Sequence, residues 1–291
     1  MAIDIASVNW PAARRARYSV TQRFRYEYPE PVLDLKHRLV VIPPERFGDQ
    51  RRLRHQVSVG LDGVRLDDRE DRFGNNVVEV FAPRVMSAIE FDVDISVERR
   101  AAQPNRLPDG WLADGYLLQP SALTTPDARI RSIADEMCAS ARSGLELADR
   151  INSWVHESMT YEYGVTGVRT TAAEALAQGA GVCQDYAHIM LTVCRACGLP
   201  ARYVSGHLLG QGGTHAWVEV VLPTNDGTGD AIAWPFDPTQ ASRAGLGHVT
   251  IAVGADYSDV APTSGTYVSP RLGRLETTKT VTLTELEYAA G

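Results

Sequence analysis

The sequence has almost no lysine. Of its 29 basic residues only Lys36 and Lys279 are lysines, and 36 acidic residues give a net charge of −7. The charge is uneven, because residues 1–100 contain 17 basic and 16 acidic residues whereas residues 101–291 contain 12 and 20. Nucleic-acid phosphates favour basic grooves, so the acidic C-terminal part argues against a nucleic-acid partner.

Cysteine and long apolar runs are also scarce. Four cysteines in 291 residues are too few for a disulfide scaffold, so we expect reduced thiols. No apolar run approaches the roughly 20 residues of a membrane span, and residues 1–17 lack the basic-then-apolar order of a signal peptide. We therefore expect a cytoplasmic protein with no membrane partner.

The order of strand-like and helix-like segments predicts an α+β chain with two domains. Residues 1–105 contain β-branched and aromatic stretches separated by turn signals, which favour an all-β, sandwich-like N-terminal domain. Residues 106–125 contain prolines and little periodicity, so they predict a linker. Residues 126–291 have helical patterns followed by strand patterns, and we expect them to form the second domain.

The individual elements follow from periodicity and turn residues. Thr171 and Glu174 have the spacing of a capping box at the start of a short helix. In the first domain strands are expected at 17–28, 35–43, 55–61, 76–81 and 88–98. In the second domain helices are expected at 126–142, 145–158, 171–179 and 182–197. Strands are then expected at 201–209, 215–222, 231–236, 248–253 and 278–287.

The most informative segment is Gly-Ala-Gly-Val-Cys-Gln-Asp-Tyr-Ala at 179–187. It places Cys183 in the first turn of an apolar helix, after a glycine-rich approach. The free N–H groups and the dipole at a helix N-terminus favour the thiolate form of a cysteine, and the same N–H groups can receive an oxyanion. Cys183 is therefore the candidate nucleophile.

Two strand residues complete this constellation. His215 begins the alternating segment His-Ala-Trp-Val-Glu-Val, and an imidazole held rigidly by a strand suits proton exchange with a thiol. Asp237 precedes Pro238, which cannot donate to a sheet ladder, so the strand is expected to end at Asp237. Its carboxylate is then free to orient the histidine, as the acid of a catalytic triad does.

Other residues compete for roles in this site. His207, in the preceding predicted strand, is the rival base. Cys194 and Cys197 form a Cys-x-x-Cys pair that could be half of a zinc or redox site, but they lie late in a helix with no second pair, so core packing is favoured. The backbone N–H of Cys183 is one oxyanion donor, and four side chains are candidates for the second: Tyr161, Tyr163, Gln178 and Gln184.

The three motifs around Cys183, His215 and Asp237, in this order, resemble the transglutaminase-like superfamily, which has a papain-like α+β fold. The likeness covers roughly residues 125–260, and it implies Cys183 as nucleophile, His215 as general acid and base, and Asp237 as the orienting carboxylate. The N-terminal part resembles the β domain that precedes this core in bacterial transglutaminase-like proteins. The matching segments are Tyr26 and Tyr28 before Pro29 and Pro31, Arg38-Leu39 before Pro43-Pro44, Asp71 to Asn75, and a tail at 248–262.

The resemblance implies acyl transfer on amide bonds through a thioester. Bacterial relatives of this type are usually described as cysteine proteases, so we expect hydrolysis of a peptide or protein amide. Transamidation of glutamine shares the same first half-reaction and is the alternative, and a non-catalytic peptide-binding module is the alternative from another class. No calcium-loop pattern is present, so we expect no metal or cofactor. The oligomeric state stays open.

Overall fold

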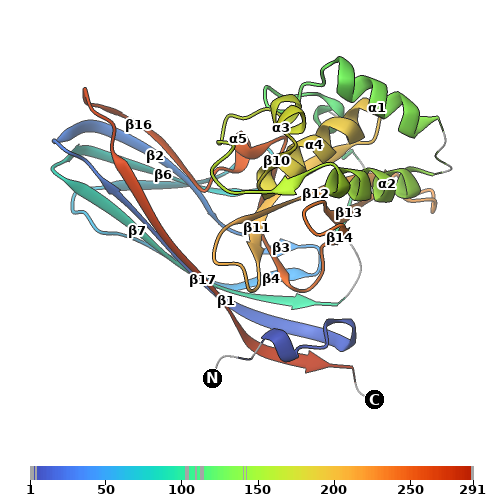
Figure 1. Ribbon diagram of the computed structural model, residues 1–291. Helices are drawn as coiled ribbons and strands as arrows, with labels where there is room; N and C mark the ends of the chain where they lie inside the picture. The colour runs from blue at the N-terminus through green and yellow to red at the C-terminus, as the bar shows by residue number, and fades with distance from the viewer. Residues whose placement is uncertain are drawn as a thin grey trace.

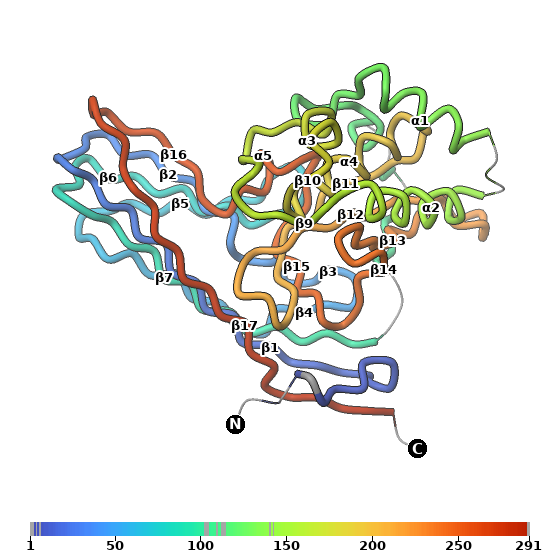
Figure 2. Tube along the Cα trace, in the orientation of Figure 1, coloured from blue at the N-terminus to red at the C-terminus, as the bar shows by residue number. Residues whose placement is uncertain are grey.

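The structure is a computed structural model that describes residues 3, 5–101, 105–108, 110–111, 115–139, 141 and 143–289. Long, twisted strands make up one part of the molecule and a helix-rich part lies beside them (Figure 1). The chain passes from the strands to the helices and returns, so its first and last strands run side by side (Figure 2).

The N-terminal part is a sandwich of two antiparallel sheets, as expected. The strand orders are β17-β1-β7-β4-β3 and β16-β2-β6-β5. Buried and exposed residues alternate along β1 and β7, so each strand presents one apolar face to the core. The strands are β1 (Ala13–Glu27), β2 (Val32–Ile42), β3 (Arg46–Phe47), β4 (Gln50–Val59), β5 (Arg65–Glu70), β6 (Asn76–Val85), β7 (Ala88–Arg100), β16 (Thr263–Val268) and β17 (Arg274–Tyr288).

The last two strands change the expected division of the chain. β16 pairs with β2 and β17 pairs with β1 along most of its length, so residues 263–288 belong to the N-terminal sheets. The expectation that the second domain extends to residue 291 is corrected accordingly. The physical reason is that β1 and β2 would otherwise be long exposed edges of their sheets, and the returning chain covers both.

The expected segments do not include β5, β8 (Asn105–Leu107), β16 and four strands of two residues each. β5 is exposed at all six positions, with the sequence Arg-Leu-Asp-Asp-Arg-Glu, and therefore has no apolar alternation. β8 lies at the expected junction, yet it pairs with a strand of the second part. Within the expected linker, residues 109 and 112–114 lie outside the described residues, and the rest includes the short helix η3 (Tyr116–Leu118).

The second part is an α+β core. Its sheet has the order β14-β13-β12-β11-β15, with β8 on β13. Helix α4 is the centre of this core, because it contacts the other long helices, β11 and β12, and is buried at every position from 184 to 195. None of the described helices is long and apolar enough to cross a membrane.

The four longest helices and the strands β11, β12, β13 and β15 overlap the expected segments, whereas α5, β9, β10 and β14 were not expected. The predicted capping box between Thr171 and Glu174 is confirmed at the start of α3. Residues 140 and 142, at the expected end of the first helix, lie outside the described residues. The helices are α1 (Ala128–Cys138), α2 (Gly144–Glu157), α3 (Ala172–Gln178), α4 (Cys183–Ala196) and α5 (Tyr257–Val260). The strands are β9 (Thr160–Tyr161), β10 (Ala180–Gly181), β11 (Ala201–Leu208), β12 (His215–Pro223), β13 (Ala231–Asp237), β14 (Ser242–Arg243) and β15 (His248–Gly254).

Side-chain amides from the sandwich join it to the edge of the core sheet. Gln50 donates to the carbonyl of Thr250 at 2.7 Å and accepts from its N–H at 2.9 Å. Asn75 makes the same pair of bonds with Val253, at 2.7 and 2.9 Å. Both amides therefore replace a missing neighbouring strand beside β15, and they satisfy backbone groups that would otherwise be buried without partners.

Replacing Gln50 by leucine should lower the free energy of unfolding by about 2 kcal/mol or more, because the buried N–H and carbonyl of Thr250 lose their partners. Gln56 lies on the same strand but is exposed, so Gln56→Leu should change stability by no more than about 0.5 kcal/mol. Denaturant unfolding of the two variants measures the difference. Equal values would show that the amide does not contribute to the interface.

Candidate active site

Cys183 is the first residue of α4 and its side chain is partly exposed. The turn into the helix brings Gly181 so close to Asp185 that a Cβ at position 181 would overlap the carboxylate. Asp185 Oδ2 accepts hydrogen bonds from the Val182 N–H at 2.8 Å and from the Thr166 hydroxyl at 2.7 Å. These contacts fix the helix N-terminus that carries the thiol, and they leave its first N–H groups available to an oxyanion.

His215 and Asp237 form a buried pair at the ends of neighbouring strands. The β12–β13 pairing runs to Val218 and Phe236, so Asp237 lies on the same face of the sheet as Trp217 and His215. The Nε2 atom of His215 lies 2.7 Å from Asp237 Oδ2, and both side chains are fully buried. The strand therefore ends at Asp237, as the following proline predicted.

The charge state of this pair follows from its partners. Burial lowers the pKa of His215, but the hydrogen bond to Asp237 and the nearby Cys183 side chain outweigh burial and raise this pKa to about 9. Burial raises the pKa of Asp237, but its bonds to histidine outweigh that effect and hold the pKa well below its usual value. Nε2 of His215 is held by Asp237, and Nδ1 makes no hydrogen bond to the described residues. Cys183 lies near enough to influence the pKa of His215, so the structure brings the three predicted residues together, with the imidazole protonated at neutral pH.

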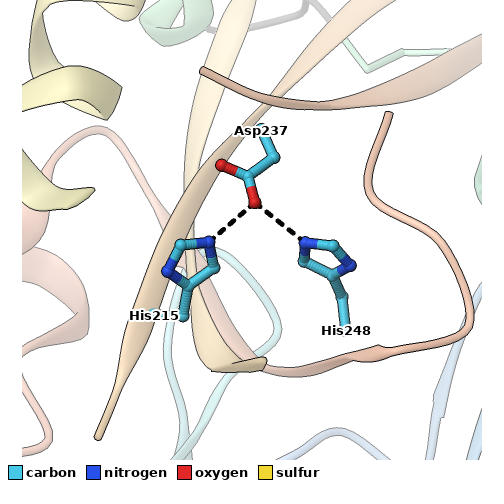
Figure 3. A group of neighbouring side chains, drawn as sticks. All are labelled: His215, Asp237 and His248. Carbon is cyan, nitrogen blue, oxygen red and sulfur yellow. Dashed lines mark hydrogen bonds and ion pairs between the residues drawn. The ribbon is translucent and has the colours of Figure 1, made fainter. Parts of the chain in front are cut away.

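A second histidine, His248, also binds Asp237. Its Nε2 lies 3.0 Å from Asp237 Oδ2, so the two imidazoles flank one carboxylate oxygen (Figure 3). Local sequence patterns do not reveal this contact. His248 begins the segment that resembles the family's tail, but a strand that is distant in sequence and antiparallel to β11 cannot be placed against Asp237 from local patterns. His248 is buried at the start of β15, but this burial becomes visible only in the folded structure.

The three side chains form the only group of the described residues with the spacing of metal ligands. The nitrogen and oxygen atoms of His215, Asp237 and His248 lie within 4.8 Å of one another. Both imidazoles already make a direct hydrogen bond to Asp237, so the buried polar atoms between them are satisfied without an ion. The hydrogen-bonded arrangement therefore accounts for this group.

The rival histidine lies elsewhere. Gly206 is the strand partner of His215 in the β11–β12 pairing, so the next residue, His207, points to the opposite face of the sheet. Its Nδ1 lies 3.2 Å from the carbonyl oxygen of Gly213. His207 is thus separated by the sheet from His215 and Asp237.

The other cysteines have ordinary positions. Cys194 is fully buried in α4, and Cys197 donates to the carbonyl of Ala134 at 3.5 Å. Cys138 is exposed at the end of α1. All four thiols are free, and neither Cys194 nor Cys197 belongs to the metal-spaced group that the described residues form.

Among the four candidates for a second oxyanion donor, Tyr161 is the one whose pKa is influenced by Cys183. Burial, the hydrogen bond to Tyr163 and the nearby charge of Cys183 raise the pKa of Tyr161. The strand β9 that carries Tyr161 pairs in parallel with β10, immediately before Cys183. Gln178 instead donates its amide to the Val165 carbonyl at 3.1 Å.

The structure thus places a partly exposed thiol and a buried histidine–carboxylate pair on an α+β core. Residues 131–237 match the transglutaminase-like superfamily, and this range includes Cys183, His215 and Asp237. Residues 18–98 match the bacterial transglutaminase-like N-terminal region. Residues 131–237 are therefore a transglutaminase-like core, preceded by a bacterial transglutaminase-like N-terminal region at 18–98.

Several mycobacterial proteins are similar to this chain. An uncharacterized protein of Mycobacterium leprae is 35% identical over 163 residues, which cover 52% of this chain and 54% of that protein. An uncharacterized protein of Mycobacterium bovis is 28% identical over 288 residues, which cover 89% of this chain and 90% of that protein. The crystal structure of a "Putative Cysteine Protease from Cytophaga hutchinsonii" has a TM-score of 0.73 at 20% identity and covers 96% of this chain and 92% of that one. It supports the two-part fold.

The pKa of His215 gives a direct test of the pair. In the native protein the ring should keep its second proton at pH 7 and lose it only near pH 9. Asp237→Asn removes the negative charge that stabilises the imidazolium, so the pKa should fall. NMR titration of the labelled ring measures both values. Asp92→Asn, on the exposed surface of β7, is the matched control and should leave the titration unchanged; a native pKa near 6.5 would contradict the arrangement.

Proposed function

We propose that the protein catalyses thiol-dependent acyl transfer on amide bonds, with Cys183 as the nucleophile, His215 as the general acid and base, and Asp237 as the carboxylate that orients His215. The observation that carries this proposal is the buried imidazole–carboxylate pair beside a partly exposed cysteine at a helix N-terminus. A buried ion pair is costly unless its partners are well placed. The pair of His215 and Asp237 lies near the Cys183 thiol.

In the first half-reaction the Cys183 thiolate, with His215 as the imidazolium partner that holds its proton, attacks the carbonyl carbon of the amide. The developing oxyanion is received by the backbone N–H of Cys183, with the Tyr161 hydroxyl as the candidate second donor. His215 then gives its proton to the leaving nitrogen, the carbon–nitrogen bond breaks, and an amine departs. The products are a free amine and a thioester on Cys183.

In the second half-reaction we propose that water resolves the thioester. His215, now neutral, takes a proton from water while the hydroxyl adds to the acyl carbon, and the thiol leaves with the carboxylic acid as product. The partial exposure of Cys183 leaves this residue open to water, and the description of the Cytophaga hutchinsonii protein as a "Putative Cysteine Protease" is in line with hydrolysis. The substrate is then a peptide or protein amide.

A peptide-amide library, incubated with and without a primary amine, tests this proposal. Mass spectrometry should show hydrolysed peptides under both conditions, since water resolves the thioester. Amine-coupled products in place of acids would assign transamidation instead. Cys183→Ala should abolish every product, because no other group forms the thioester.

Cys138→Ser is the control for thiol chemistry in general. Cys138 is an exposed thiol at the end of α1, so its loss should leave turnover unchanged. Peptide binding without turnover in the native protein would identify a binding module, and turnover that survives Cys183→Ala would refute the assigned nucleophile.

A further inference from the structure

The Gly245–His248 turn, just before β15, connects the sandwich to the buried Asp237 carboxylate. We propose that His248 is a positioning residue that fixes the Asp237 carboxylate for His215, and that the N-terminal sandwich sets the place of His248 through Arg99. The expected effect of His248 on catalytic rate rests on the proposed function. The hydrogen bonds from which this role is inferred do not depend on that function.

The hydrogen bonds of His248 determine where its proton lies. The backbone N–H of Gly245 donates to Nδ1 of His248 at 3.2 Å, so Nδ1 must present a lone pair. In the neutral ring the hydrogen is then on Nε2, which lies 3.0 Å from Asp237 Oδ2. His248 is therefore a neutral donor to the carboxylate, and burial, which lowers its pKa, keeps it neutral.

The Asp237 carboxylate is held from three directions. Oδ2 accepts from His215 and His248, and Oδ1 accepts from the backbone N–H of Thr239 at 3.0 Å. With only His215 and the backbone N–H as partners, the carboxylate could rotate about its last side-chain bond. The bond from His248 opposes that rotation and so keeps Oδ2 in line with His215.

The position of His248 depends in turn on the N-terminal sandwich. Arg99 of β7 donates to the carbonyl of Gly245 at 2.6 Å and also to the carbonyl of His248. Its guanidinium is fixed by Asp49, to which Nε donates at 3.1 Å and Nη2 at 2.6 and 2.8 Å. The Tyr18 hydroxyl donates to the carbonyl of Leu246 at 2.5 Å. Side chains of β1 and β7 thus bind three backbone carbonyls of the turn that carries His248.

A cavity beside His248 makes the contribution of its ring measurable. The cavity has a volume of about 660 Å³, and its walls include His248, Trp217 and Arg99. It lies between the sandwich and the core sheet. Because His248 lines it, removal of the ring in His248→Ala would open a place for a free imidazole molecule, which can make the same hydrogen bonds.

The central experiment compares His248→Ala with and without added imidazole, using hydrolysis per titrated active site. The variant should lose at least about tenfold in kcat with little change in KM, because a small displacement of a catalytic group has effects of that size. Imidazole at millimolar concentration should restore most of the loss. His207→Ala removes another buried ring of the core sheet with no bond to Asp237, and any loss there should not respond to imidazole.

Two results would overturn the proposal. A folded His248→Ala variant with native kcat would show that the Asp237 carboxylate keeps its position without His248. A loss of kcat that imidazole does not restore would show that His248 contributes only to the stability of the fold. Nitrogen NMR of the labelled histidines is independent of turnover: His248 should be the neutral Nε2–H form in the native protein and in Cys183→Ala. An Nδ1–H form would refute the contact even in an active enzyme. An inactive protein with the Nε2–H form would refute only the proposed function.

Arg99→Gln tests the contribution of the sandwich. It should reproduce the loss in kcat, and nitrogen NMR should show that the bond of His248 to Asp237 is weakened. The matched control is Arg23→Gln, which removes an arginine–carboxylate pair to Asp92 on the same sheet. Asp92 lies seven residues from Arg99 along β7, roughly 23 Å away, so Arg23→Gln should change neither measurement. Equal effects of both variants would contradict the specific role of Arg99.

Discussion

The Asp237 carboxylate is completely buried, and a buried charge is stable only where its oxygens accept hydrogen bonds. It meets that requirement with two imidazole rings and one backbone N–H. The arrangement raises the pKa of His215 and thereby keeps a proton beside Cys183. The elements around the site can be understood as means of holding these partners: β12 holds His215, β13 ends at Asp237, and β15 begins with His248.

The sandwich has a clear physical relation to this site. It contacts the edge of the core sheet through Gln50 and Asn75, whose amides replace a missing strand, and through Arg99, which binds the turn before β15. The edge strand β15 would otherwise expose unpaired backbone groups. The two parts of the chain therefore share one structural task, since the same contacts that complete the core sheet also fix the turn that carries His248.

The sequence predicted those features that depend on local patterns. Cys183 was identified by a glycine-rich approach to a helix, and Asp237 by the proline that ends its strand. The fold class and the sandwich also followed from alternation and turn residues. His248 could not be assigned to the site in this way, because its contact with Asp237 depends on the pairing of β15 with β11. The pairing of β17 with β1 is likewise a contact between the two ends of the chain, and β5 has no apolar side to recognise.

The central claim is that an acyl group passes through a thioester on Cys183. Rapid acid quenching during turnover of a peptide amide, followed by intact-mass measurement and peptide mapping, tests it most directly. We predict one acyl group per active chain, attached to Cys183 and released by hydroxylamine. Turnover with no acylated protein under conditions of slow deacylation, or with the acyl group on any other residue, would contradict the account.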